Sequence, residues 1–181
     1  APLVHGDDAT VRATGVQVTQ KFIDQDQVDG MTGVVPTPLA YGIRNAVHAA
    51  KLIFIDTNAG GNALTRDTTN CTPSCKSPYI FRSSFSSYQI SYPIGEYLSA
   101  KGTKEFFLAY ANYGFGTESA ADFTTGLKKN GGSTTGNVAP PLANADFAPF
   151  VTQIKNQPTT NVYSFFSGAA AIGLIKSWNS L

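Results

Sequence analysis

The sequence predicts an α/β protein whose sheets are mainly parallel, and three observations support this fold class. Short apolar runs typical of buried strands alternate with segments of helical periodicity from one end of the chain to the other. A length of 181 residues, with 42% hydrophobic and 14% charged residues, allows one domain or two small lobes with an apolar core. The runs end in loops rich in glycine and in hydroxyl and amide side chains, as strand-to-helix turns do.

Apolar spacing predicts the elements of the first half in order. We expect a first strand at residues 3–5, and then a helix with four apolar or small residues on one face: Val11, Gly15, Val18 and Phe22. The run "VDGMTGVV", residues 28–35, reads as a strand and loop. The next helical stripe contains Leu39, Ile43, Ala46, Val47 and Ala50. The strand "LIFID" at residues 52–56 and a loop at residues 60–78 follow.

The same pattern predicts the elements of the second half. A strand begins at Tyr79, and the next helix carries Pro93 in its first turn and stops at Gly102. A strand at residues 105–110 leads into a helix that ends at the Gly131-Gly132 pair. The remaining expected elements are a weak strand near residue 137, a helix over 147–154, the strand "NVYSFF" and a last helix from about residue 170.

The two cysteines lie close together in the loop segment "NCTPSC". Cys71 and Cys75 are spaced for a small disulfide ring, whereas a zinc ion would need two further ligands. His5 and His48 do not stand at ligand spacing from them. We therefore predict a disulfide between Cys71 and Cys75 and no metal site, and a disulfide indicates an exported protein.

Charge and hydropathy argue against several partners. The chain has 13 Lys and Arg against 12 Asp and Glu and no basic run, so no nucleic-acid partner is expected. No segment has the roughly 18 continuous apolar residues of a membrane span. The first residues lack the order of a signal peptide, so we expect a soluble chain from which any signal has been removed.

The segment "FFLAYANYGFGTESAADF" raises the question of a nucleotide site, because Gly114-Phe115-Gly116 stands between an expected strand and helix. Ser119 occupies the third glycine position, and no acidic residue follows about 20 residues later. The phosphate-loop motif and the G-x-S-x-G elbow are both absent from the sequence. The adjacent acids Asp7 and Asp8 fit helix capping better than catalysis. The sequence therefore predicts neither an enzyme nor a cofactor.

Six segments in order resemble a known family. They are "DDAT", "GVQVTQKFIDQDQVDGMTGVV", "LIFIDTNAGGNAL", "YIFRSS", "YANYGFGTES" and "DFAPFVTQIKNQPTTNVYSFFSG". Together they resemble the substrate-binding proteins of ABC transporters in the branched-chain amino acid group, which have the two-lobed type I periplasmic-binding-protein fold. The resemblance covers nearly the whole chain, although each segment alone is weakly specific.

The resemblance implies how the chain is organised. Residues 1–86 would form part of the first lobe and residues 87–181 part of the second, each a mainly parallel sheet flanked by helices. Family members are longer than this chain, and the elements not found here would cover apolar sheet faces and edges. We therefore expect a partial chain with exposed apolar surface.

The resemblance also implies the ligand contacts. In the first lobe they would be Pro36, Thr37 and Pro38 after one strand and Asn58, Ala59 and Gly60 after the next. In the second lobe Tyr113 would lie over the ligand, while Gly114 and Gly116 let its loop turn tightly. After the last strand, Gly168 and Ala169 would complete the set. Amino acid binders often have an aromatic residue after this glycine, and Ala169 and Ala170 depart from that pattern.

The function implied by these assignments is non-covalent capture of a small molecule. An extracytoplasmic solute-binding protein, periplasmic or extracellular, would hold a small amino acid or organic carboxylate between two lobes and deliver it to a membrane ABC permease. The alternative is a ligand-sensing extracellular receptor domain of the same fold.

Overall fold

The computed structural model describes residues 2–66, 76–143 and 146–181. The chain divides into two compact units, Ala1–Ser86 and Ser87–Leu181. Both are built from parallel strands and flanking helices, so the predicted fold class is confirmed. Their assignment to two lobes of the family fold stays a prediction.

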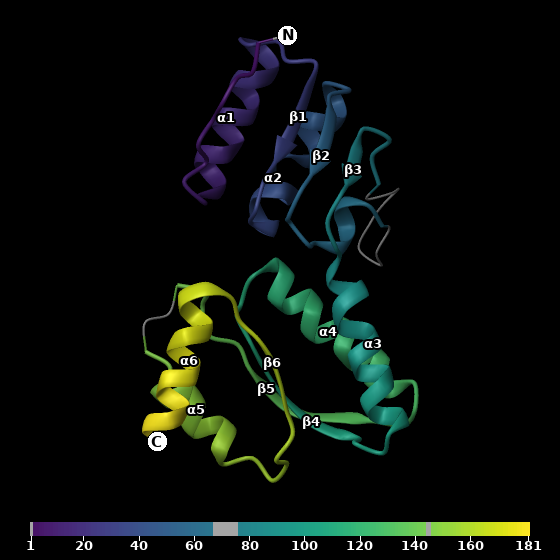
Figure 1. Ribbon diagram of the computed structural model, residues 1–181, viewed down its shortest axis with the longest axis vertical. Helices are drawn as coiled ribbons and strands as arrows, with labels where there is room; N and C mark the ends of the chain where they lie inside the picture. The colour runs from purple at the N-terminus through teal and green to yellow at the C-terminus, as the bar shows by residue number, and fades with distance from the viewer. Residues whose placement is uncertain (1, 67–75, 144–145) are drawn as a thin grey trace. The chain divides into compact units, whose positions relative to one another are not determined.

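The first unit is a three-stranded parallel sheet in the order β1-β2-β3 (Figure 1). Its elements are α1 (Arg12–Asp24), β1 (Gly30–Gly33), α2 (Thr37–Ala49), β2 (Ile53–Asp56), the 3-10 helix η1 (Asn62–Leu64) and β3 (Ile80–Arg82). Gly33 pairs with Asp56, and Asp56 pairs with Arg82. The carboxyl ends of all three strands therefore lie at one edge of the sheet.

The two faces of this sheet differ in burial. On one face, Leu39, Ile43 and Val47 of α2 pack against Phe54 and Ile80, and α1 packs against α2. On the other face Ile53, Ile55 and Phe81 are 42%, 42% and 51% exposed. Both faces of a parallel sheet are usually covered. The exposed apolar surface that the sequence led us to expect is therefore present.

The expected first strand at residues 3–5 is not formed. Residues 2–6 instead line a crevice of about 530 Å³ whose opposite wall includes the edge strand β1. This crevice contains none of the predicted ligand residues.

The second unit is a three-stranded parallel sheet in the order β5-β4-β6, with α3 and α4 on one face and α5 and α6 on the other (Figure 1). Its elements are α3 (Ser87–Ala100), β4 (Glu105–Tyr110), α4 (Gly114–Lys128), β5 (Ser133–Val138), α5 (Ala148–Lys155), β6 (Val162–Phe165) and α6 (Gly168–Ser180).

The central strand β4 is buried on both faces. Phe106 and Leu108 pack with Phe123 and other residues of α4, whereas Phe107 packs on the opposite side with Ile154 of α5. This two-sided burial explains why the strand is a continuous apolar run in the sequence.

Helix α3 begins earlier than its apolar stripe suggests. It starts at Ser87, so Pro93 lies inside the helix and not in the first turn. The Ser87 hydroxyl donates a hydrogen bond of 2.5 Å to the Asp122 carboxylate of α4. The polar start of α3 is thus fixed by a tertiary contact. The spacing of apolar residues in the sequence cannot predict such a contact.

Candidate ligand-binding site

The first group of predicted ligand residues lies where α2 begins. Pro36 precedes the helix in an extended conformation, and its carbonyl accepts N–H bonds from Leu39 and Ala40 at 3.0 and 3.1 Å. Thr37 is only 2% exposed, while Pro36 and Pro38 are half-buried. The first turn of a helix has N–H groups without intrahelical partners, and it attracts negative charge.

The second group lies in the loop after β2. The Asp56 carboxylate accepts N–H bonds from Asn58 and Ala59 at 3.3 and 2.9 Å. This pattern folds the loop back over the strand end. Ala59 and Gly60 are buried, whereas the Asn58 side chain is exposed.

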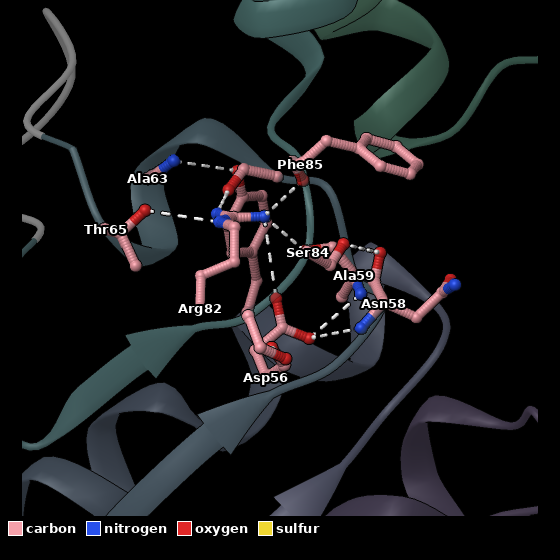
Figure 2. A network of polar contacts seen from close by, with 11 residues as sticks. Asp56, Asn58, Ala59, Ala63, Thr65, Arg82, Ser84 and Phe85 are labelled. Atoms are coloured by element: carbon pink, nitrogen blue, oxygen red, sulfur yellow. Dashed lines mark hydrogen bonds and ion pairs between the residues drawn. The ribbon is translucent and has the colours of Figure 1, made fainter.

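Arg82, at the end of the neighbouring strand β3, holds the same loop from the other side (Figure 2). Its guanidinium donates to the carbonyls of Ala59 and Gly61 and, at 3.2 Å, to that of Phe85. Its Nη1 lies 3.5 Å from Oδ2 of Asp56.

The two groups in this unit are in contact. A Cβ added at Gly61 would overlap the Thr37 side chain and the Tyr41 ring of α2. The Tyr41 hydroxyl also accepts an N–H bond of 3.1 Å from Ala63. Residues 36–38 and 58–60 are therefore neighbours at the carboxyl edge of the sheet.

The carboxyl of Asp56 is fully buried, and this burial raises its pKa above the ordinary value of 3.8. The N–H bonds from Asn58 and Ala59 and the charge of Arg82 lower the pKa but do not outweigh desolvation. The ionised form of Asp56 is thus less favourable in the folded protein than in water.

In the second unit Tyr113 is the last residue before α4. It is extended, with φ −150° and ψ 169°, and its carbonyl accepts the Thr117 N–H at 3.0 Å. A Cβ added at Gly116 would overlap the Ala111 carbonyl oxygen, so only glycine fits this close turn. This requirement explains the glycine at position 116 without a nucleotide.

Tyr113 also contacts the loop after β6. Burial raises its pKa above 10.0, and a hydrogen bond with the Ser167 side chain opposes that rise. The phenol is therefore neutral at pH 7. The neighbouring Phe115 ring packs edge-on against Phe165 at 4.8 Å between centroids. Tyr113 consequently lies next to the loop that carries Gly168 and Ala169.

Gly168 and Ala169 open helix α6, and both are exposed. Gly168 has φ +55°, a conformation that favours glycine. The structure therefore gathers the predicted ligand residues into one group in each unit. Their role in binding stays a prediction.

Sequence reasoning missed three residues that shape these groups: Asp56, Arg82 and Ser167. A signal for the first two was available, because "FID" and "IFR" each end an apolar strand with a charge of opposite sign. Ser167 lies in the predicted strand-end loop at residues 167–170, but the sequence predicts no contact for its side chain. Its bond to Tyr113 depends on the neighbouring positions of β4 and β6, which the sequence does not give directly.

Other predicted features have different outcomes. Asp7 and Asp8 do not cap α1, since each accepts an N–H bond two residues on, from Ala9 and Thr10 respectively. Nδ1 of His48 lies 2.9 Å from the Ser77 hydroxyl, within hydrogen-bond distance. Cys71 and Cys75 lie outside the described residues. Among the residues that the structure describes, no cluster of three metal-ligating side chains occurs.

Comparison with known proteins decides the family. A family model described as "Periplasmic binding protein" matches residues 2–180. The chain belongs to this periplasmic binding protein family. The resemblance seen in the sequence is thereby confirmed, including its branched-chain type.

Several relatives of this binding protein are known. It is 26% identical to Leu/Ile/Val-binding protein homolog 6 of Brucella melitensis, over 89% of this chain and 39% of that protein. A solved solute-binding protein of an ABC transporter from R. palustris, in complex with 4-hydroxybenzoate, is 27% identical with a TM-score of 0.84. That alignment covers 98% of this chain and 46% of the other.

A second solved solute-binding protein, from Rhodopseudomonas palustris BisB5, was crystallised with 3,4-dihydroxybenzoic acid. It is 27% identical, with a TM-score of 0.84, over 99% of this chain and 47% of that one. The periplasmic binding protein chain thus spans less than half the length of these relatives. They are solute-binding proteins, not enzymes, in agreement with the predicted lack of catalysis. No helix within the described residues is long and apolar enough to cross a membrane.

Proposed function

We propose that this protein is an extracytoplasmic solute-binding protein that captures a small organic carboxylate or amino acid and delivers it to an ABC permease. Residues 1–86 and 87–181 then form parts of its two lobes. The observation that carries the proposal is the gathering of the predicted ligand residues at the carboxyl ends of parallel strands in each unit. In open α/β sheets ligands bind at these strand ends.

The chemistry of the first unit suits a carboxylate. At the start of α2 the N–H groups of Leu39 and Ala40 already bond to the Pro36 carbonyl, and Pro38 has none. The helix start therefore offers the Thr37 N–H and hydroxyl and the positive end of the helix dipole. The neighbouring loop adds the exposed amide side chain of Asn58, whereas the N–H groups of Asn58 and Ala59 are already bonded to Asp56. A ligand carboxylate held here would be bound by hydrogen bonds and not by a buried cation.

The chemistry of the second unit suits an apolar or aromatic ligand body. Tyr113 presents an aromatic ring with a neutral hydroxyl, and its loop is held by the close turn at Gly116. Ala169 is small and exposed where amino acid binders often have an aromatic side chain. Two relatives more than 25% identical were solved with hydroxylated benzoates. We therefore place aromatic carboxylates ahead of amino acids as ligands.

A thermal-shift panel tests the proposal. The complete protein is heated with benzoate, 4-hydroxybenzoate, 3,4-dihydroxybenzoate, leucine, isoleucine and valine. A ligand that binds only the native state adds about 2.7 kcal/mol of stability at 100 times its Kd, so a clear rise in Tm is expected. The methyl ester of the best acid is the control, and it should give no rise.

Two results would contradict the proposal. One is a panel in which no carboxylate raises the Tm of the protein. The other is stoichiometric nicotinamide or flavin absorbance in the purified protein, which would indicate cofactor chemistry at the Gly114 turn instead.

A further inference from the structure

The Arg82 side chain is buried at the end of β3, and its contacts are concentrated on the loop after β2. It is 7% exposed, and it donates to two carbonyls of that loop, those of Ala59 and Gly61. Its Nε donates to the Thr65 hydroxyl at 3.3 Å, just past η1. These bonds use donors on several sides of one planar guanidinium, which a lysine ammonium cannot match.

Asp56 makes the complementary set of bonds to the same loop (Figure 2). Its Oδ1 accepts the N–H groups of Asn58 and Ala59, while its Oδ2 faces Arg82 at 3.5 Å. Ala59 is thus held through its N–H by Asp56 and through its carbonyl by Arg82. Buried backbone groups outside a helix or sheet need such partners, because an unpaired one costs about 1–3 kcal/mol.

We infer that Asp56 and Arg82 are positioning residues that fix the loop at residues 57–61 in its ligand-binding conformation before ligand arrives. We do not propose that Asp56 or Arg82 contacts the ligand. The inference rests on the proposed function, because the loop carries the predicted contacts Asn58, Ala59 and Gly60. A loop held in its bound shape loses less conformational entropy on binding, so affinity depends on this pair.

The experiment compares three variants of the complete protein: Arg82→Gln, Arg82→Lys and the control Arg12→Gln. Arg12 is an exposed arginine of α1 in the same unit, so its loss changes net charge equally. Hydrogen exchange by mass spectrometry follows the amides of residues 57–64 against those of α2. Calorimetric titration with 4-hydroxybenzoate, or with the panel compound that gives the largest thermal shift, follows affinity.

For Arg82→Gln we expect faster exchange at residues 57–64, unchanged exchange in α2, and affinity about tenfold lower or worse. Arg82→Lys keeps a positive charge opposite Asp56, but a single nitrogen cannot replace the bonds that Nε, Nη1 and Nη2 make. Its exchange rate at residues 57–64 and its affinity should therefore lie between those of Arg82→Gln and the wild type. Arg12→Gln should match the wild type in both measurements. If Arg82→Gln does not fold, Arg82→Lys carries the comparison.

Two outcomes would overturn the inference: unchanged exchange at residues 57–64 in a folded Arg82 variant, or faster exchange there with wild-type affinity. A wild-type protein that binds no panel compound would contradict the proposed function instead. In that case the exchange measurement alone decides whether Arg82 orders the loop.

Discussion

Asp56 shows how a single buried acid links strand, loop and neighbouring charge. Its side chain is fully buried, yet it is the acceptor for two loop N–H groups and the partner of Arg82. Desolvation is the largest influence on its pKa and raises it. The bonds that hold the loop therefore involve a carboxyl group whose ionised form is disfavoured by burial.

Asp56→Asn should change how stability depends on pH. Because the folded pKa is raised above 3.8, the stability that Asp56 contributes is fully present below that pH and is lost as pH rises through the folded pKa. The free energy of unfolding of the wild type, relative to Asp56→Asn, should therefore decrease as the pH rises above 3.8. Urea denaturation at several pH values measures this difference, and a difference that increased with pH would contradict the account.

At the scale of elements, the helices were predictable because their apolar residues recur at helical spacing, as in α2. The start of α3 was not, since the contact of Ser87 with Asp122 joins residues far apart in sequence. The strand expected at residues 3–5 is not formed, although these residues lie across a crevice from the edge strand β1. The loops were predictable from their glycine, hydroxyl and amide residues. The Asp56–Arg82 pair that holds one of them was not, because it joins the ends of two strands that are far apart in sequence.

Helices α3 and α4 pack closely against each other through two glycines. A Cβ added at Gly95 would overlap the Phe123 carbonyl oxygen, and one added at Gly126 would overlap that of Tyr92. Backbone atoms of a helix cannot rotate away as a side chain can. Two glycines therefore set the distance between these helices.

Gly95→Ala should consequently destabilise the protein by about 1–3 kcal/mol, despite the higher helix propensity of alanine. Gly30→Ala is the matched control, because a Cβ there would meet its nearest neighbour, the Ile53 carbonyl oxygen, at an ordinary 3.4 Å. Denaturant unfolding followed by circular dichroism measures both variants. Equal stability of Gly95→Ala and wild type would show that α3 and α4 can separate without cost.

At the scale of the whole molecule, one sheet face stands out as uncovered. Ile53 and Ile55 of β2 and Phe81 of β3 lie on it, and Ile55 pairs in register with Phe81. Contiguous apolar patches of this kind drive association when nothing covers them. The matched relatives are more than twice as long as the aligned chain, so further chain could cover such a face in a longer protein.

A polypeptide of these 181 residues should therefore associate with itself as its concentration rises. Replacing Ile55 and Phe81 together by threonine should shift it toward the monomer, because threonine suits strands but reduces apolar area. Val11→Thr, at an exposed apolar residue outside the sheet, should have no effect. Light scattering after size exclusion measures the mass, and a wild-type monomer at every concentration would contradict this prediction.

The central claim is that Tyr113 contacts a small ligand, and the affinity of a Tyr113 variant tests it most directly. Calorimetric titration of the complete protein with 4-hydroxybenzoate, or the best compound of the panel, should show saturable binding that Tyr113→Ala weakens about tenfold or more, because an aromatic contact and its buried area are lost. Tyr97→Ala removes an exposed tyrosine of α3 and should bind as the wild type does. Wild-type affinity in a folded Tyr113→Ala protein would contradict the account.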